Sequence, residues 1–339
     1  MESKIGQFLD YLKHEKNVSP HTLSAYKTDL SEFSKYIKEN GTSKVDHQVI
    51  RGFLSRLDNN KNSKSTMGRK LSSIKSFYKF LVKTGACKDN PAVYVSRPKA
   101  PKYLPLFFTE GEIKKLLETP LLVIKNPDLA INNPGLIPRD PFLALRDKLI
   151  LELLYDLGIR LSELVGINIG DIDYEGKTIL IRGKGKKERL ALFGEHIKKH
   201  LNLYLDTRHL ISKTRDTNGA LILNYRGERI GTRQVQRLVK KYCRLGGLSD
   251  KFSPHSIRHS FASHLLNRGC DLRIIQELLG HTLISTTEKY THISQNQLFE
   301  VYHKAHPRSN GKNEDKEIPC YPLRRKRGGQ ASFKDGDSR

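Results

Sequence analysis

The sequence predicts a mainly α-helical protein of two domains, the second of which is an α+β domain with a small antiparallel sheet. Its 339 residues are enough for two domains that each bury a core. Apolar residues recur at helical spacing in both halves of the chain, whereas two short β-rich runs flank a glycine- and lysine-rich turn at 183–187. Between the halves, residues 90–105 hold four prolines and show no helical periodicity.

The charge is strongly basic. Lysine and arginine total 60 against 36 acidic residues, a formal charge of +24, which favours a polyanionic partner. Nucleic acid is the first candidate and an anionic membrane surface the second. No apolar run approaches the length of a membrane span, and four scattered cysteines (Cys87, Cys243, Cys270 and Cys320) lack zinc or disulfide spacing. We therefore expect a cytoplasmic protein with reduced thiols and no membrane association.

Residues 1–89 form the first predicted domain, made of helices and short polar turns. One helix begins with Ser19 as N-cap and Pro20, and repeats apolar residues at spacings of three and four. A later helix carries Met67, Leu71, Ile74, Tyr78 and Leu81 and ends near Gly85. Four lysines lie together on a flanking face of this later helix: Lys64, Lys75, Lys79 and Lys83. That face either contacts a DNA backbone or is simply solvated, and both interpretations stay open.

Residues 90–108 are a predicted basic linker, and a capping box of Thr109 and Glu112 opens the second domain, residues 109–306. Its first long helix runs from 140 to Leu157 and stops at Gly158. Further helices are predicted around 235–242, from Ser253 to Gly269 and from Asp271 to Gly280. Residues 121–140 are a predicted surface loop, and 307–339 a predicted basic, disordered tail.

Six residues of the second domain stand out by their type and position, and three of them, Arg160, His255 and Arg258, suit a phosphate. Arg160 follows a glycine turn, and Lys184 lies between two glycines of the hairpin turn. His255 and Arg258 share a helix face near its N-terminus, where free N–H groups favour an anion. His281 follows a helix-ending glycine, and Tyr290 lies on the next short helix, capped by Ser285 and Glu288. Taken singly, each of these residue types is more often structural.

The order and spacing of the six resemble the tyrosine recombinase family, in particular its Xer-like site-specific recombinases. The matching motifs are "LGIRLSELVG" with Arg160, "GKGKKERLAL" with Lys184, "PHSIRHSFASHLL" with His255 and Arg258, and "LGHTLISTTEKY" with His281 and Tyr290. The resemblance covers residues 1 to about 306. It implies a helical, SAM-like core-binding domain followed by a tyrosine-recombinase catalytic domain.

The resemblance also implies the chemistry. Tyr290 would attack a DNA phosphodiester to give a 3′-phosphotyrosyl link and a free 5′ hydroxyl. We expect His255 to accept the phenol proton, because a phenol is almost fully protonated at neutral pH. Lys184 would protonate the leaving oxygen, while Arg160, Arg258 and His281 would bind the phosphate. Exchange of one phosphate ester for another needs no ATP, metal or other cofactor, and the sequence contains no Walker loop.

Two further residues leave alternatives open. Glu163, one turn after Arg160, either orients that guanidinium or is a surface helix charge. His259 lies four residues after His255, a spacing that zinc helices use, but no cysteine or carboxylate obviously completes a site, so we predict no metal.

Double-stranded DNA with a specific recombination site is the expected partner. Ser294 and Gln297 resemble the capping box of a short C-terminal helix that bears Leu298, Val301, Tyr302 and Ala305. By resemblance to the family, this helix docks into a neighbouring subunit, giving a homo- or hetero-tetramer on two duplexes. The same amphipathic helix is equally compatible with folding back on its own domain. The resemblance favours DNA recombination in chromosome or plasmid dimer resolution, hence chromosome partition and the cell cycle. A mobile-element integrase, a type IB-like topoisomerase and a catalytically silent DNA-binding protein are the alternatives, and a metal-dependent transposase ranks last.

Overall fold

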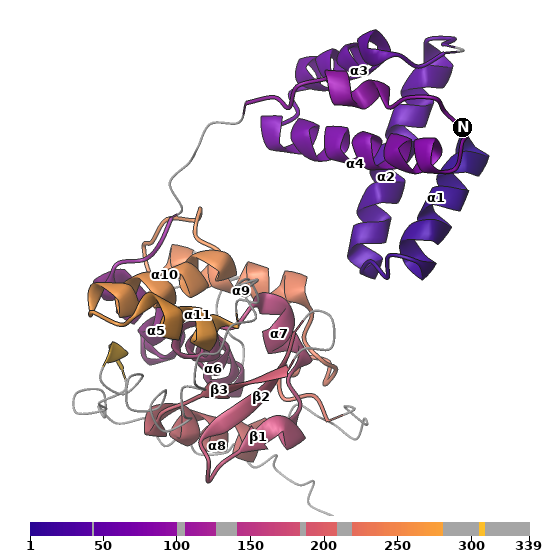
Figure 1. Cartoon of the computed structure of the whole chain (residues 1–339). Coiled ribbons are helices and arrows are strands. Elements are labelled where there is room, and N and C mark those ends of the chain that lie inside the picture. The colour runs from indigo at the N-terminus through magenta and orange to yellow at the C-terminus, as the bar shows by residue number, and fades with distance from the viewer. Residues whose placement is uncertain are drawn as a thin grey trace, which may run out of the picture. The chain divides into compact units, whose positions relative to one another are not determined.

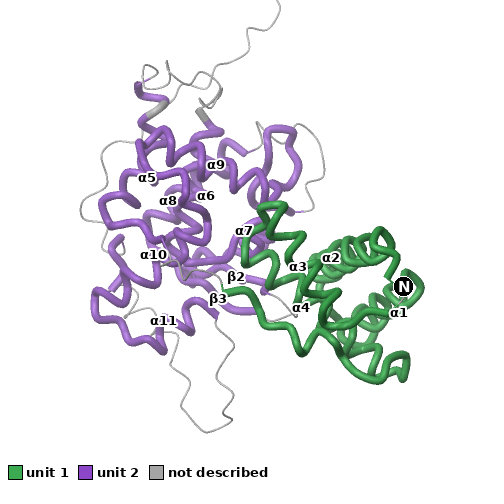
Figure 2. The backbone as a smooth tube through the Cα atoms, turned by 90° about the horizontal axis from the view of Figure 1, so that it is seen from above, with its two compact units in different colours: residues 1–104 green, residues 105–339 purple. Residues whose placement is uncertain are grey.

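The computed structural model describes residues 1–42, 44–99, 106–126, 141–183, 188–208, 219–280 and 305–308. The chain divides into two compact units, residues 1–104 and 105–339, which Figure 2 colours separately. The first is entirely helical in its described part, and the second combines helices with a three-stranded antiparallel sheet. The predicted fold class is therefore confirmed.

The first unit contains helices α1 (Glu2–His14), α2 (Pro20–Glu39), α3 (His47–Asn59) and α4 (Lys64–Lys83), and the 3-10 helix η1 (Pro91–Tyr94) (Figure 1). The predicted start of α2 is confirmed, since the Ser19 side chain accepts a hydrogen bond from the Thr22 N–H and Pro20 is the first helical residue. The apolar stripe predicted for α4 is buried throughout. Aromatic rings fill the core between the helices, among them Phe8, Phe33, Phe53 and Phe77.

A buried carboxylate fixes α4 against α2. Asp29 of α2 is fully buried and accepts hydrogen bonds from Arg69 Nη1 at 2.5 Å and Ser73 Oγ at 2.8 Å.

The predicted lysine face lies on α4. Lys64 donates to Asp58 at 2.6 Å, and Lys83 lies 3.5 Å from Glu15. Two of its four lysines are thus paired within the unit, which favours the solvated interpretation for those two.

The centre of the second unit is α6 (Pro141–Asp156). It packs against α5 (Glu110–Lys125), α8 (Glu195–Arg208) and α10 (Pro254–Asn267) (Figure 1). Leu149, Ile150, Leu151, Leu153 and Leu154 are all fully buried, as expected for a helix that is apolar on nearly all sides. The predicted end of this helix is confirmed at Gly158, whose φ is +55°.

The sheet has the order β1-β2-β3, with β1 (Ile172–Asp173), β2 (Thr178–Arg182) and β3 (Glu188–Leu192). The predicted hairpin is confirmed, with Ile179 paired to Ala191 and Arg182 to Glu188. The two-residue edge strand β1 was not predicted, because it is too short to show a period. The hairpin turn 184–187 lies outside the described residues.

The described part of the unit also contains α7 (Leu161–Gly166), the 3-10 helix η4 (Ile169–Asp171), α9 (Thr232–Leu245) and α11 (Leu272–Leu279). The predicted N-cap of α10 is confirmed, since Ser253 Oγ accepts from the Ser256 N–H. The chain at Phe108 holds α10 in place: its N–H donates to Ser260 Oγ at 2.7 Å, and its carbonyl accepts from His264 Nε2 at 2.8 Å. Phe108 itself, at the end of the predicted linker, is fully buried in the core of the second unit.

The predicted surface loop 121–140 is wrong for its first residues. Helix α5 continues through Pro120 to Lys125, because Leu121 and the residues after it extend its pattern and Asn126 ends it. Residues 127–140, the predicted helix of Tyr290 and the tail after Arg308 lie outside the described residues. Of the predicted C-terminal helix from Ser294, only its last apolar residue, Ala305, is described.

Residues 305–308 pack on the second unit, to which they belong. Ala305 belongs to its core, and His306 is buried between the rings of Tyr155 and Phe261. Arg308, which falls in the range predicted as a disordered tail, is 8% exposed and forms two ion pairs with α6: Nη2 lies 2.9 Å from Glu152 Oε1, and Nη1 lies 3.0 Å from Asp156 Oδ2. This four-residue segment is therefore bound in cis.

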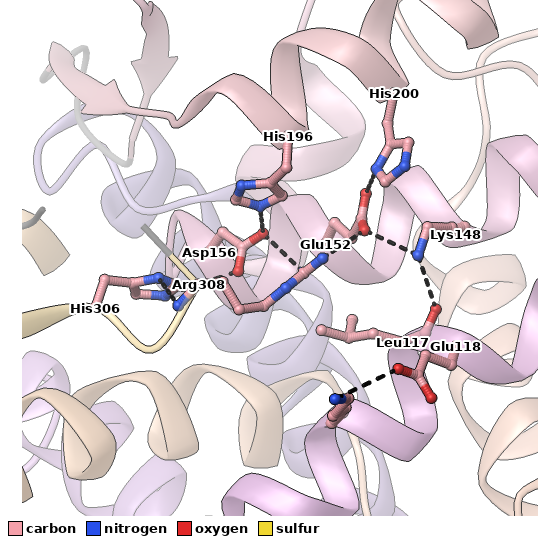
Figure 3. A network of polar contacts seen from close by, with 10 residues as sticks. Leu117, Glu118, Lys148, Glu152, Asp156, His196, His200, His306 and Arg308 are labelled. Carbon is pink, nitrogen blue, oxygen red and sulfur yellow. Dashed lines mark hydrogen bonds and ion pairs between the residues drawn. The ribbon is translucent and has the colours of Figure 1, made fainter. Parts of the chain in front are cut away.

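The two carboxylates of α6 are the centre of a larger polar network (Figure 3). His200 Nδ1 of α8 lies 2.5 Å from Glu152, and His196 Nε2 lies 2.7 Å from Asp156. Lys148 lies 3.2 Å from Glu152. Burial alone would raise the pKa of both carboxyls, but the surrounding cations hold each pKa below its usual range. Arg308 and Lys148 balance the two negative charges.

No helix in the described ranges is both long and apolar enough to cross a bilayer. Cys87, Cys243 and Cys270 are free thiols.

Candidate active site

Arg160 follows directly from the turn that ends α6. Gly158 has a φ of +55°, and a Cβ at this position would lie 2.5 Å from the ring of Phe261. Only glycine fits both the backbone conformation and this close approach. Two residues later Arg160 occupies the N-cap of α7, with 42% of its side chain exposed, so that its guanidinium is accessible to a ligand.

Glu163 is buried and binds Arg160 through both of its carboxylate oxygens. Its Oε1 accepts from Arg160 Nη1 at 2.7 Å, and its Oε2 accepts from the Arg160 backbone N–H at 2.9 Å. Of the two interpretations left open by the sequence, orientation of Arg160 is correct and a surface charge is wrong. Burial would raise the pKa of the Glu163 carboxyl, yet the hydrogen bonds from Arg160 and the charge of Arg189 hold that pKa below its usual value.

Arg258, on the second turn of α10, joins two loops. Its Nη1 donates to the Gly158 carbonyl at 2.5 Å, and its Nη2 donates to the Leu279 carbonyl at 2.7 Å. The first carbonyl belongs to the turn that leads to Arg160. The second lies two residues before His281. The same Nη1 is 3.9 Å from Glu163 Oε2. Burial, with the nearby charge of Arg160, lowers the pKa of Arg258 to about 10.

His255 is exposed on the first turn of α10, three residues before Arg258. It is thus on the same helix as Arg258 and accessible to a substrate. His259, the other histidine of the metal hypothesis, is half-buried with its ring edge-on to Phe107 at 5.8 Å. Within the described ranges there is no group of three or more histidines, cysteines or carboxylates that could hold a metal ion.

Lys184, His281 and Tyr290 lie outside the described residues. Their neighbours are described. Arg182 ends β2 and Glu188 begins β3, on either side of the turn with Lys184. Gly280, in the left-handed conformation with a φ of +65°, ends α11 immediately before His281. Arg160 and Arg258 are thus brought together around Glu163, and the attachment points of two further predicted residues are defined.

Sequence reasoning missed one residue, Arg189. It lies on β3, and its Nη2 donates to Glu163 Oε2 at 3.1 Å. Side chains along β3 point alternately to the two faces of the sheet. Leu190 is 50% exposed on one face, whereas Arg189 lies on the other, core-facing side with buried Ala191. A charged residue in the core-facing phase of a strand needs a partner. That phase was the signal that could have found it.

Comparison with known proteins assigns the family. Residues 137–297 match the model of the phage integrase family, and residues 5–85 match that of the phage integrase N-terminal SAM-like domain. Tyrosine recombinase XerC of Thermodesulfovibrio yellowstonii is 44% identical over 308 residues, which cover 90% of this chain and 96% of the relative. The chain belongs to the phage integrase family of tyrosine recombinases. The recombinase is also similar to XerC of Syntrophus aciditrophicus, at 39% identity over 92% of this chain and 99% of the relative.

Solved structures agree on the fold of this recombinase. The XerH site-specific recombinase bound to a palindromic difH substrate has a TM-score of 0.63 at 22% identity, over 88% of this chain and 80% of that one. A lambda integrase dimer bound to a COC′ core site has a TM-score of 0.61 at 15% identity, over 87% of this chain and 99% of that one. Together with the XerC relatives, the family identifies the protein as an enzyme, a site-specific DNA recombinase of the Xer type.

Proposed function

We propose that this recombinase cleaves and rejoins the strands of double-stranded DNA at a specific site, through a 3′-phosphotyrosyl link to Tyr290. The observation that carries the proposal is the arrangement around Glu163. Arg160 and Arg258 meet at one buried carboxylate, and Arg258 joins the turn before Arg160 to the residue before Gly280. Two guanidinium groups fixed in this way suit the oxygens of a phosphate better than a neutral ligand.

The proposed cleavage begins at the phenol oxygen of Tyr290, which forms a bond to the scissile phosphorus while the bond to the 5′ oxygen breaks. His255 accepts the phenol proton, and Lys184 donates a proton to the leaving 5′ oxygen. Arg160, Arg258 and His281 stabilise the negative charge that grows on the non-bridging oxygens. Attack by the 5′ hydroxyl of another strand reverses these steps. The number and type of phosphate ester bonds are conserved, so the reaction uses no cofactor.

Binding of DNA is supported by the charge of the chain, +24. On the lysine face of α4, Lys75 and Lys79 are the residues we propose for phosphate contacts, together with Lys64 and Lys83 when DNA replaces their acidic partners. Their contribution is electrostatic and carries no sequence information.

Assembly as a homo- or hetero-tetramer on two duplexes is proposed by analogy with a lambda integrase tetramer solved on a Holliday junction. The C-terminal helix from Ser294 remains the proposed contact between subunits. Ala305, the last apolar residue predicted for this helix, and the three residues after it are bound to their own unit. A contact between subunits through this helix therefore either involves only residues before 305 or requires that residues 305–308 leave their own unit.

The biological role we propose is dimer resolution of a chromosome or plasmid in the cytoplasm, which connects the enzyme to chromosome partition. It is supported by the XerC relatives, which match over at least 96% of their own length in the two cases above.

The proposed function is tested by covalent capture. Purified protein is mixed in EDTA with nicked fragments of its own genome, and DNA that stays attached through detergent is sequenced. Wild type should retain DNA concentrated at one sequence, and Tyr290→Phe should retain none, because only the nucleophilic hydroxyl is removed. Tyr225→Phe is the matched control, since Tyr225 is 65% exposed in the same unit and should behave as wild type. Attachment by Tyr290→Phe, or none by wild type, would contradict the proposal.

A further inference from the structure

We propose that Arg189 is a third arginine of the phosphate site: a positioning residue that acts through Glu163 and whose charge stabilises the transition state. The inference rests on the proposed function, because it assumes that Arg160 and Arg258 bind the scissile phosphate. It adds a residue from β3, an element that the sequence connected with the site only through Lys184.

Arg189 determines the orientation of the carboxylate that holds the other two arginines. Its Nη2 donates to Glu163 Oε2 at 3.1 Å, the oxygen that also accepts the Arg160 N–H at 2.9 Å and lies 3.9 Å from Arg258 Nη1. This leaves Glu163 Oε1 to the Arg160 guanidinium. The other guanidinium that bonds to Glu163 is that of Arg160, the N-cap of the same helix. Arg189 is thus the residue that bonds to Glu163 from a different element.

A second contact connects Arg189 to the turn before His281. A Cβ built on Gly280 would lie 2.5 Å from Arg189 Nε and 2.6 Å from its Cδ. The backbone at Gly280 therefore lies directly against the arginine side chain. Arg189 thus bridges two parts of the site that are distant in sequence: Glu163 on α7 and the residue that precedes His281.

Stability alone does not explain an arginine here. The side chain of Arg189 is 16% exposed, and its Nη1 is inaccessible to solvent and has no hydrogen-bond partner in the described part of the chain. A buried donor left unpaired destabilises the folded state. Replacing buried charged groups by apolar residues of similar size is often neutral or stabilising. The property that we assign to Arg189 is therefore its charge and not a gain in stability.

The charge balance of the site favours a phosphate transition state. The guanidinium groups of Arg160, Arg189 and Arg258 surround the single carboxylate of Glu163, which gives this cluster a net charge of +3 − 1 = +2. A DNA phosphodiester carries one negative charge, and the charge on the phosphoryl oxygens and the two apical oxygens increases as the phosphorus is attacked. Loss of the Arg189 charge would lower the charge of this cluster from +2 to +1, and this loss would weaken its attraction for a species with two negative charges more than for one with a single negative charge. Arg189 therefore contributes more to the transition state than to binding.

The test compares a charged and an uncharged scissile group. Two duplexes carry the attachment site recovered by covalent capture, one with the natural phosphodiester and one with a neutral methylphosphonate at the scissile position. Single-turnover attachment is measured at saturating protein. We expect Arg189→Gln to lower the rate of attachment to the phosphodiester about 10- to 100-fold. The rate on the methylphosphonate should fall less than about threefold, because the uncharged group needs less cationic stabilisation. Arg189→Lys, which keeps the charge, should restore part of the lost rate on the phosphodiester.

Arg268→Gln is the matched control. Arg268 forms a similar two-point ion pair with Glu110, at 3.1 and 2.9 Å, at the far end of α10, and both rates should equal those of wild type. The ratio of the two rates within one preparation does not depend on how much of a variant is folded.

Three outcomes would overturn the inference. Equal slowing on both substrates would show that Arg189 only maintains the structure, and unchanged rates on both would show that it is dispensable. These two results leave the proposed function intact. Absence of attachment by wild type on the phosphodiester would overturn both proposals together.

Discussion

Glu163 is the residue through which the three arginines of the site are connected. Arg160 is bonded to it twice, Arg189 once, and Arg258 lies 3.9 Å away. The carboxylate is held in its charged form by this surrounding, since its pKa is lowered in spite of burial. Glu163 is therefore the anion that keeps three cations together.

The first prediction concerns this carboxylate. Glu163→Gln keeps the shape but removes the negative charge, so the arginines repel one another. We expect the free energy of unfolding of the protein to fall by about 3 kcal/mol in urea titrations. Glu188→Gln, at a carboxylate with half of its side chain exposed beside Arg182, should change it by less than about 1 kcal/mol. A loss in Glu163→Gln no larger than that of the control would show that Glu163 is not needed to hold the cluster.

His306 provides a prediction of pH dependence. Burial against Tyr155 and Phe261, with the charge of Arg308 nearby, lowers its pKa to about 3, although Asp156 at 3.7 Å acts in the opposite direction. In the unfolded chain the pKa is about 6.5. As the pH falls below 6.5, the unfolded state takes up the proton first, so stability is complete above 6.5 and is lost progressively towards the folded pKa.

The expected loss from His306 is about 2 kcal/mol of unfolding free energy between pH 7 and pH 5. His264, whose pKa is also lowered by burial, adds to the slope of wild type. His306→Gln should therefore lose less stability than wild type over this interval, by about 2 kcal/mol, in urea titrations at both pH values. An equal loss of unfolding free energy in the two proteins between pH 7 and pH 5 would mean that His306 is not buried as a neutral group.

At the scale of elements, each of two described turns leads to a residue that we propose for catalysis. The end of α6 at Gly158 leads to Arg160, and the end of α11 at Gly280 leads to His281. Both glycines have positive φ and both are in close contact with a side chain from another element, Phe261 and Arg189 respectively. A single guanidinium, that of Arg258, donates to a carbonyl in each turn region.

Gly158→Ala tests the role of the first turn. Gly269 is the matched position, since its φ is +80° and nothing lies within 4 Å of a Cβ there, so that Gly269→Ala introduces backbone strain alone. That strain should cost about 1–2 kcal/mol. Gly158→Ala adds a contact of 2.5 Å with Phe261 and should cost at least about 1 kcal/mol more in thermal unfolding. Equal costs at the two glycines would show that α6 and α10 move apart easily.

Most elements were predictable because their ends carry local signals. Ser19, Thr109 and Ser253 cap helices as their residue types indicate, and Gly280 ends one. The strand β1 and the helical extension of α5 through Pro120 were not predictable: one is too short, and the other goes against the local preference of proline.

In the site, too, some residues were predictable from the sequence and others were not. Arg160 and Arg258 follow from motif order. The inward phase of Arg189 on β3 indicates that this residue needs a partner, but the identity of that partner, Glu163 of α7, depends on a long-range contact that no local signal contains.

For the whole molecule, the bound segment 305–308 links the C-terminal region to the catalytic core. Arg308 lies between Glu152 and Asp156 of α6, with His196 and His200 from α8 (Figure 3). Any assembly that moves this region to another subunit must either keep this contact or replace it.

Arg308→Met tests how strongly the segment is held. The variant leaves Glu152 and Asp156 buried with one full cation fewer, so unfolding free energy should fall by about 3 kcal/mol. Arg244→Met, at a surface arginine 3.7 Å from Asp250 with both side chains 60% exposed, should cost less than about 1 kcal/mol. Limited proteolysis should cut Arg308→Met, but not the control, between residues 280 and 309. Resistance equal to wild type would mean that Arg308 does not hold the segment.

The most direct measurement of the mechanism identifies the residue that carries DNA. Protein captured on its site is digested with nuclease and trypsin, and the modified peptide is sequenced by mass spectrometry. We predict a nucleotide joined through its 3′ phosphate to the peptide Tyr290–Lys304, with fragment ions that place it on Tyr290 and not on Tyr302. A nucleotide on any other residue, or one joined through a 5′ phosphate, would contradict the proposed mechanism.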